Sequence, residues 1–480
     1  MLRLRRIRIP CGWSSSVGIH CAGQKGTVEL VANMAGRKSE PAPVFTGGPA
    51  ADHEVAARQL AALREQLANL PPKPARTPEE QTAAEALLTR GHAIREAFLT
   101  EHAEAVYETV TNGFRTSLRV GELVDAVALR FPELVPSRAQ LAAHQLPLKD
   151  RDSLEIAQGI FLAQVLARPR TGHHLLHAMA QPRQEALDLL DTLLLDDAVD
   201  LGVVHVQRKD NVGHVTVQNH SCLNAEDDAS TAALETAVDL VLLDDRIEAG
   251  VLRGGPATHP KYAGRRVFSS GINLTHLYHG RISLTDFFLE RELGVVNKLY
   301  RGHDLAPPRP GALESRHEKP WIGAVDSFAI GGGCQFLLVL DRVVAETGAY
   351  FNLPAGKEGI IPGCGVMRLP RFLGEGPARE AVLFNRDFPV DSPDGRRLVS
   401  EVVDPARMDD AIARAVDQLM ACGLPSVRAN RRAMRLGAEP LDLFRTYMAH
   451  YARDQAYCAH SDALIHNLER TWSAHRRRPK

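Results

Sequence analysis

The chain has 480 residues, enough for two or three domains of about 150 residues each and for a large buried core. Hydrophobic residues make up 44% and charged residues 24%, and 57 Lys and Arg balance 58 Asp and Glu to a formal net charge of -1. This balance excludes the strongly basic composition of a nucleic-acid or membrane-surface protein, so we expect neither as a partner.

The cysteines also narrow the class of protein. They are odd in number, widely spaced and contain no CxxC pair, at Cys11, Cys21, Cys222, Cys334, Cys364, Cys422 and Cys458. This pattern predicts neither a disulfide framework nor a zinc cluster and is typical of a reducing compartment. No apolar run approaches the roughly 18 to 20 residues of a membrane span. We therefore expect a cytoplasmic protein.

Residues 1–50 show neither a helical nor a strand period. The first 24 residues are rich in Arg and Ser and contain no acid, which superficially suits a transit peptide, but they lack the apolar stretch of a secretory signal. We predict a disordered extension or a mis-called start, with translation beginning near Met34.

Residues 51–198 are predicted to form a helical N-terminal domain. Apolar residues recur at spacings of three and four in ADHEVAARQLAALREQLANL (51–70), and again in the stretch that begins at Thr77, a predicted N-cap followed by acids. Further helical patterns cover 141–167 and 185–195.

At Val199 the pattern changes to strands that alternate with helices. VDLGVVHVQRKD (199–210) and GHVTVQNH (213–220) are rich in β-branched residues and joined by a turn-like KDNVG. Helices are predicted at 228–245 and 284–300, and strands at 251–255, 265–271 and 319–330, which indicates an α/β fold over 199–440. Proline-rich 303–320 is predicted as an exposed surface insertion, and 441–480 as a C-terminal helical segment.

SFAIGGGCQF (327–336) places three glycines between an apolar strand-like segment and a helix-like one. It has neither the Walker spacing nor the G-x-G-x-x-G spacing of a dinucleotide fold. Glycine lets backbone N–H groups approach a ligand closely, and the start of a helix presents unpaired donors and a positive dipole end. Such a turn suits a developing oxyanion.

Three motifs in order resemble the crotonase (enoyl-CoA hydratase/isomerase) superfamily. GGGCQ and the downstream EGIIPGCGVMRLPRFLG (358–374) resemble its core signature, FSSGINL (268–274) its oxyanion loop, and LNAEDDAS (223–230) the segment beside the acyl-CoA adenine. The resemblance covers roughly 199–440. It implies the crotonase ββα-spiral fold, a CoA thioester substrate, and a homo-oligomer that is a trimer or a dimer of trimers.

The resemblance also implies two backbone donors that hold the thioester oxygen as an enolate forms, the N–H groups of Ile272 and Gly332. Hydratases of the superfamily carry two glutamates that handle water. This chain has Gln335 at the first position and Ala355 at the second. Neither can act as a general base, so ordinary hydration should fail. Glu358 is displaced by three residues and does not simply replace the second acid.

Within the superfamily, the long helical N-terminal domain and SSGINLTHLYHGRISLTDFFLERELG (269–294) are similar to the branch of metal- and cofactor-free oxygenases. That resemblance implies conversion of 3,5-dihydroxyphenylacetyl-CoA and O2 into 3,5-dihydroxyphenylglyoxylate and CoA, without metal or organic cofactor, in dihydroxyphenylglycine and glycopeptide antibiotic biosynthesis. We expect an apolar pocket for O2, with Leu274, Ile360 and Ile361 as wall residues.

The remaining site residues follow from the resemblance. Glu226, Arg291 and Gln335 are expected at the ring hydroxyls, with Glu226 the best candidate for the base that removes the α-proton. On sequence alone, Arg291 would rather lie on a solvated helix face. The substrate site is predicted to comprise His220, Glu226, His259, Pro260, Lys261, Tyr262, Ser270, Gly271, Ile272, Asn273, Leu274, Arg291, Gly331, Gly332, Gly333 and Ile361.

Three rival functions remain open. A metal-dependent oxygenase would need a triad such as His460, Asp462 and His466, but such spacings arise by chance in a chain with 20 histidines. An isomerase, thioesterase or decarboxylase could use the same oxyanion hole without O2. A non-catalytic acyl-CoA-binding protein could tolerate the missing acids.

Overall fold

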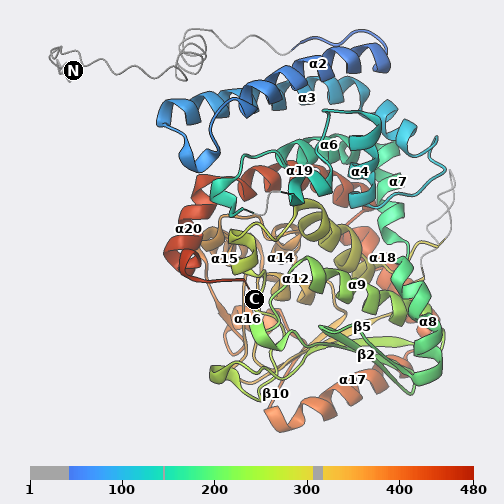
Figure 1. Ribbon diagram of the computed structural model, residues 1–480. Coiled ribbons are helices and arrows are strands. Elements are labelled where there is room, and N and C mark those ends of the chain that lie inside the picture. Colours follow the sequence, from blue (N-terminus) through green and yellow to red (C-terminus); the bar gives the residue numbers. More distant parts are fainter. Residues whose placement is uncertain (1–42, 144–145, 306–316, 480) are drawn as a thin grey trace, which may run out of the picture.

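The computed structural model describes residues 43–143, 146–305 and 317–479 (Figure 1). Met34 and most of the predicted extension lie outside the described residues. The N-terminal part is helical, with α2 (Pro49–Ala68), α3 (Pro78–Val110), α4 (Val120–Arg130), α5 (Arg138–Ala142), α6 (Ile156–Ala167), α7 (Pro169–Ala180) and α8 (Gln184–Asp196). In Figure 1, α2 and α3 lie side by side at the end of the molecule farthest from the strands.

The predicted cap of α3 is confirmed. Thr77 accepts a hydrogen bond from the Glu80 N–H (3.2 Å), and the Glu80 carboxylate accepts one from the Thr77 N–H (2.9 Å). This reciprocal arrangement satisfies two donors that the helix leaves without partners.

The single helix predicted over 141–167 is wrong in its first half. The chain instead passes through a short 3-10 turn, η2 (Leu148–Asp150), before α6 begins at Ile156. Pro147 precedes the turn with an extended backbone and has no N–H to donate, so it interrupts a helix that the apolar spacing alone favours.

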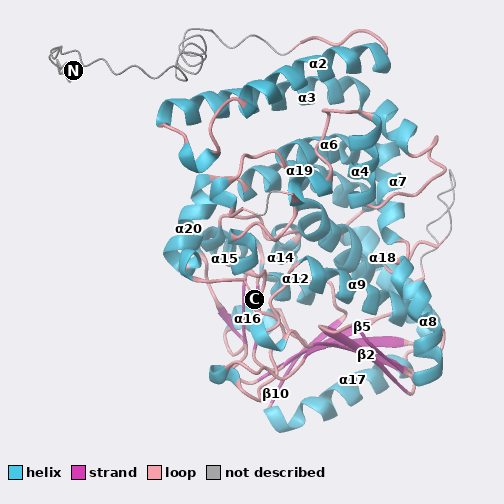
Figure 2. Cartoon of the chain, viewed as in Figure 1, coloured by secondary structure: helices cyan, strands magenta, loops and turns pink. Residues whose placement is uncertain are grey.

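A mixed sheet forms the opposite end of the molecule (Figure 2). Its strand order is β1-β2-β3-β4-β5-β7-β10, antiparallel from β1 to β3 and parallel from β3 onwards. The strands are β1 (Ala198–Asp200), β2 (Val204–Lys209), β3 (Val212–Val217), β4 (Ala249–Gly254), β5 (Trp321–Val325), β7 (Arg342–Glu346) and β10 (Glu401–Val403). A smaller sheet contains β6 (Phe328–Ile330), β8 (Tyr350–Asn352) and β9 (Phe388–Pro389). The predicted strand at 265–271 forms only isolated bridges, such as Ser269 with Ala329.

Helices cover both faces of the large sheet. The neighbours Val251 and Leu252 point to opposite faces, and each is buried, Val251 with residues of α17 and Leu252 with residues of α9. The helices of this part are α9 (Asp228–Leu243), α10 (Leu274–Tyr278), α11 (Asn297–Arg301), α12 (Gly332–Leu337), α13 (Ala355–Glu358), α14 (Gly365–Leu373), α15 (Glu375–Phe384), α16 (Pro393–Arg397), α17 (Met408–Ala421) and α18 (Leu424–Ala438).

The helix predicted at 284–300 is present but widened. It consists of two π-helical segments, η5 (Leu284–Leu289) and η6 (Arg291–Val296), and continues as α11. π-helical turns are rare and frequently occur at functional sites. Here the widened turns carry three consecutive charged side chains, Glu290, Arg291 and Glu292, into the interior, where all three are buried.

The C-terminal helices α19 (Leu441–Ala459) and α20 (Asp462–Trp472) return to the N-terminal helices. α19 packs along α6, and one apolar core joins residues of the N-terminal helices, of η5 and of α19 and α20. Parts of the three ranges predicted from the sequence therefore share one core.

The segment 303–320 was predicted to be exposed, but several residues of its described flanks are buried, although Leu305 is exposed. His303 and His317 form a two-hydrogen-bond bridge, and Glu318 and Lys319 are about 1% exposed. Residues 306–316 lie outside the described residues. Among the described residues, no helix is long and apolar enough to cross a membrane, and Cys334, Cys364, Cys422 and Cys458 are free.

Candidate active site

Two glycine-bearing loops meet at the carboxyl end of β6. The Ile330 N–H donates to the Ser269 carbonyl (3.0 Å), which aligns the FSSGI loop with the GGG turn. Gly271 and Gly331 adopt positive φ values of 81° and 53°. A Cβ atom on Gly271 would lie 3.1 Å from the Ile330 carbonyl oxygen and 3.5 Å from the Gly331 Cα. The two loops therefore lie in van der Waals contact, and glycine is required for it.

The two predicted oxyanion donors are free at this junction. The Glu226 N–H donates to the Gly271 carbonyl and the Glu226 carbonyl accepts from Asn273, so the chain on both sides of Ile272 is engaged. Gly332 is the first residue of α12, where a helical N–H has no partner within its helix. No acceptor in residues 43–143, 146–305 or 317–479 receives the N–H of Ile272 or Gly332.

Arg291 connects the predicted polar residues. Its side chain is buried. The Nε atom donates to the Glu226 carboxylate (2.6 Å), and the Nη1 atom donates to the Glu292 carboxylate (2.7 Å) and to the side-chain amide oxygen of Gln335 (3.0 Å). Burial alone would lower the pKa of the guanidinium, but the carboxylates of Glu226 and Glu292 outweigh burial and raise it above its ordinary value. The solvated helix face that the sequence alone favours is wrong for Arg291.

Glu226 is fully engaged as an acceptor. One carboxylate oxygen binds Arg291, and the other accepts from the Ser269 hydroxyl (2.8 Å). The carboxylate lies directly beneath Gly332, where a Cβ atom would overlap it. Glu226 therefore supports the glycine turn and holds Arg291, and it does not line the cavity described next. This geometry does not favour Glu226 as the base.

A small cavity lies between the glycine loops, the π-helical segment and the loop after β8. The predicted site residues Ile272, Gly332, Gln335 and Arg291 border it together. The other lining residues are Phe287, Phe288, Glu292, Gly331, Pro354, Glu358, Ile360, Ile361, Pro362, Gly363 and Tyr451. Ile360 and Ile361 thus form part of its apolar wall as predicted, whereas Leu274 does not.

Glu292 is a residue that the sequence analysis missed. Its carboxylate binds Arg291 and accepts the Cys364 N–H (3.0 Å), and a Cβ atom on Gly363 would overlap it. The signal was present in the sequence, because three adjacent charges interrupt a mostly apolar helix. Tyr451, from α19, had no local signal, since it is brought to the cavity only by the packing of α19.

Glu358 ends α13 and borders the cavity. Protein atoms surround its carboxyl densely even though part of the side chain is exposed. Burial raises the pKa of this carboxyl to about 8, and the neighbouring Lys357 opposes the rise.

The predicted CoA contacts lie on an exposed surface outside the cavity. His259, Pro260 and Lys261 are exposed and belong to the turn η4 (Pro260–Tyr262) and its cap, and the Lys261 ammonium lies 5.2 Å from the Tyr262 ring centroid. The carbonyl of His220 accepts from the Thr258 hydroxyl (3.1 Å), which joins this turn to the segment before LNAEDDAS.

Other predicted residues have structural contacts in this structure. The Asn273 side chain caps α10 by accepting the His276 N–H (3.1 Å), and the Ser270 hydroxyl donates to the Cys222 carbonyl (3.2 Å). A Cβ atom on Gly333 would lie 2.7 Å from the Ser269 Cβ, so this glycine permits close packing.

The residues considered for a metal triad are not assembled. His460 ends α19 and contacts Glu155 (3.0 Å), while Asp462 begins α20, so the HSD letters span a helix break and not one helix. Within the described residues, no three His, Cys, Asp or Glu side chains are grouped to hold a metal ion.

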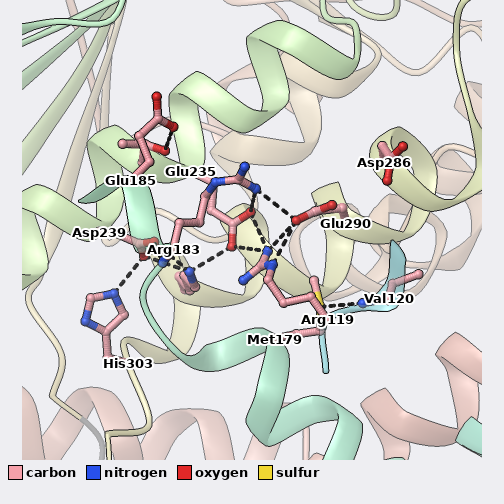
Figure 3. Close-up of polar contacts among 12 residues, drawn as sticks. Arg119, Val120, Met179, Arg183, Glu185, Glu235, Asp239, Asp286, Glu290 and His303 are labelled. Atoms are coloured by element: carbon pink, nitrogen blue, oxygen red, sulfur yellow. Dashed lines mark hydrogen bonds and ion pairs between the residues drawn. The ribbon is translucent and has the colours of Figure 1, made fainter. Parts of the chain in front are cut away.

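A buried ionic cluster adjoins the π-helical segment at Glu290 (Figure 3). Glu290, next to Arg291, accepts from Arg119 (2.6 Å) and Arg183 (2.9 Å), both from the N-terminal helical part. Arg119 also donates to Glu235 of α9 (2.8 Å). We call this set, with Asp239, Lys298 and His303, the Glu290 cluster. It ties the N-terminal part to the segment that carries Arg291.

The chain is similar to known proteins over most of its length. Residues 311–463 match the enoyl-CoA hydratase/isomerase family. The chain is 45% identical over 416 residues to the (3,5-dihydroxyphenyl)acetyl-CoA 1,2-dioxygenase of Amycolatopsis orientalis, covering 86% of this chain and 94% of the relative. It is 24% identical over 243 residues to the short-chain-enoyl-CoA hydratase of Clostridium acetobutylicum, covering 50% and 84%. The solved structure of Pseudomonas aeruginosa OdaA aligns with 58% of the chain and 100% of its own, at 21% identity and a TM-score of 0.47.

Proposed function

The chain belongs to the enoyl-CoA hydratase/isomerase (crotonase) family, and we propose that it is a dioxygenase that needs neither metal nor organic cofactor. Its substrates would be 3,5-dihydroxyphenylacetyl-CoA and O2, and its products 3,5-dihydroxyphenylglyoxylate and CoA. The observation that carries the proposal is the 45% identity to a dioxygenase over 94% of that relative's length.

The cavity supports thioester chemistry without hydration. Two free backbone donors, at Ile272 and Gly332, face a space that also contains Gln335. Gln335 cannot act as a general base, and Ala355 at the second acid position is buried and has no proton to give. A thioester bound here could be polarised, but the two acids that would activate water are absent.

The first step would be removal of the α-proton. The Cα–H electron pair moves into the thioester, and the oxygen that gains charge is held by the two N–H groups. Preorganised donors of this kind are worth about 3 kcal/mol each in other enzymes. The α-carbon is acidified further because it lies between the thioester and an aryl ring.

The second step would be reaction of the enolate with O2. The electron-rich α-carbon reduces O2 and forms a C–O bond to it, and the terminal peroxide oxygen attacks the thioester carbonyl and expels CoA thiolate. Loss of the second α-proton, whose Cα–H electron pair forms the C=O bond as the O–O bond breaks, leaves a keto oxygen and a carboxylate oxygen, both from O2. Phe287, Phe288, Ile360 and Ile361 supply apolar surface that would admit O2 and exclude water.

The polar side of the cavity suits a dihydroxylated ring. Arg291, Gln335 and Glu292 border the cavity as donors and acceptors in a fixed network. A site of buried polar groups rejects a substrate that lacks the matching hydroxyls, because the groups would then be left unpaired.

The biological setting follows from the same proposal. The acyl-CoA substrate would contact the exposed turn at Lys261, and the enzyme would act in the cytoplasm as a trimer or a hexamer made of two trimers. The product would serve dihydroxyphenylglycine formation for glycopeptide antibiotics such as vancomycin.

Oxygen uptake tests the function. We expect purified enzyme, treated with a chelator, to consume one O2 for each CoA released from 3,5-dihydroxyphenylacetyl-CoA, and to release no CoA under argon. Equal CoA release under argon would instead indicate a thioesterase. An isomerised or decarboxylated product formed without O2 uptake would indicate an isomerase or a decarboxylase. Binding of the thioester without turnover would indicate a non-catalytic acyl-CoA-binding protein.

A further inference from the structure

Glu358 is the acidic side chain in the cavity that the chemistry above does not use. It shares the cavity wall with Ile272 and Gly332, whose N–H groups would hold the thioester oxygen. Resting on the proposed function, we propose that Glu358 is the general base that takes the α-proton from the bound thioester. Ala355, which occupies the position of the second hydratase acid, lies one turn earlier on the same short helix, so the acidic group of this chain is displaced along α13.

The other carboxylates near the cavity are occupied. Glu226 accepts from Arg291 and Ser269, and Glu292 accepts from Arg291 and from the Cys364 N–H. A carboxylate that accepts such charge-assisted hydrogen bonds is stabilised in its ionised form and is a weak base. Neither is suited to take a proton from carbon.

Glu358 differs because its carboxylate has no hydrogen-bond or ion-pair partner among the described residues. The one phenol on the cavity wall described here, Tyr451, is neutral at working pH, because burial raises its pKa well above the ordinary value. An unpartnered carboxylate in a dense apolar surrounding is a stronger base than an ordinary one.

The position of Glu358 is fixed by packing. α13 contacts α20 and α15, and Gly359, which ends the helix with a φ of +84°, lies against Leu464 of α20. A Cβ atom at this position would lie 3.0 Å from the Leu464 Cα. The Lys357 N–H donates to the Asn385 side chain (2.9 Å), which holds the helix against α15.

The charges that face Glu358 are few. Lys357 precedes Glu358 on its own helix, and α20 and α15 present the neutral amides Asn467 and Asn385 to α13. The same cavity is also lined by Arg291, paired with Glu292, and by neutral Tyr451. None of these groups binds the Glu358 carboxylate directly.

These surroundings predict how the step depends on pH. In the step, the Cα–H bond breaks, its electron pair moves to the thioester oxygen, and the proton passes to a Glu358 oxygen and later to water. The carboxyl must be ionised to act, and burial raises its pKa to about 8. The rate of α-proton removal should therefore rise with pH and level off above about pH 8.

Exchange of the α-proton for deuterium, measured under argon with 3,5-dihydroxyphenylacetyl-CoA in D2O, tests the proposal without O2. We expect wild type to exchange, Glu358→Gln to lose at least about 100-fold of the exchange rate, and Glu358→Asp to retain part of it. Glu380→Gln, at an exposed position of α15, is the control and should exchange like wild type.

The outcomes separate this proposal from the proposed function. Exchange by Glu358→Gln at the wild-type rate, with the wild-type pH profile, overturns the role of Glu358 while wild-type O2 uptake still supports the dioxygenase. If wild type neither exchanges nor takes up O2, the proposed function is overturned. Loss of exchange in Glu358→Gln counts for the proposal only if the thioester still binds, as measured by calorimetry; lost binding would contradict it.

Discussion

At the scale of single residues, the cavity depends on the absence of a side chain at position 332. Gly332 does not have a positive φ, so its requirement is steric: a Cβ atom would overlap the Glu226 carboxylate beneath it. Any displacement of Glu226 would move Arg291, which it binds. Replacing Gly332 with Pro would remove its N–H but would add the same overlap, so it would not isolate the effect of the lost donor.

We therefore predict that Gly332→Ala lowers kcat for O2 uptake by about tenfold or more, since misplacing one oxyanion donor costs that much in other enzymes. Gly376→Ala in α15 is the matched control, because a Cβ atom there meets nothing within 4 Å. In a Glu226→Ala background the added methyl group has room, so the further loss should be smaller. Equal kcat values for Gly332→Ala and Gly376→Ala would contradict the steric argument.

Glu358 should also make stability depend on pH. Its folded pKa of about 8 lies above the ordinary value of 4.5, so between these values the unfolded chain loses a proton that the folded chain retains. Stability is therefore lost as pH rises through this window. At pH 5 the Glu358→Gln variant and wild type should have similar free energies of unfolding. At pH 9 the variant should be more stable than wild type by on the order of 2 kcal/mol. Urea unfolding measures this difference, and a difference independent of pH would contradict the raised pKa.

The site residues that belong to a sequence motif could be predicted, whereas those that only tertiary packing brings to the cavity could not. Ile272, Gly332 and Gln335 belong to glycine-rich signatures, and the structure brings them together with Arg291. Glu226 was also found, but its hydrogen bonds to Ser269 and Arg291 depend on tertiary contacts that no spacing reveals. Tyr451 reaches the cavity only because α19 packs where it does.

At the scale of elements, the widened helix from Leu284 to Val296 is the part of the fold that the sequence describes least well. Apolar spacing predicted a helix there, and a helix is present. Its π-helical form could not be predicted, because it depends on buried partners: Arg119 and Arg183 for Glu290, and Glu226 for Arg291. The Glu290 cluster therefore links the N-terminal helices to the position of Arg291.

We predict that Arg119→Met lowers the free energy of unfolding by about 3 to 5 kcal/mol, because it leaves buried Glu235 and Glu290 with less compensation. It should also lower kcat, since Glu290 adjoins Arg291. Denaturant unfolding and O2 uptake measure the two effects. Arg130→Met, at an exposed position of α4, is the control. A variant at Arg119 with wild-type stability and kcat would show that the cluster does not support the site.

At the scale of the whole molecule, one core crosses the boundaries predicted at residues 198 and 440. It joins Phe98 of α3, Phe288 of η5 and Phe444 of α19. Periodicity identified the class of each segment, from helices to alternating strands and helices, because that pattern is local. The return of α19 to α6 is not local, and the sequence gives no spacing that would predict it. The helical N-terminal part thus shares a core with η5 and α19, which both contribute residues to the cavity wall.

The central claim is that both oxygen atoms of O2 enter the product. Turnover of 3,5-dihydroxyphenylacetyl-CoA under 18O2, stopped with acid at early times and analysed by mass spectrometry, tests it most directly. We expect an arylglyoxylate with two labelled atoms, one in the keto group and one in the carboxylate, and unlabelled CoA. A carboxylate oxygen that comes from water, shown by label from H218O and not from 18O2, would contradict the account.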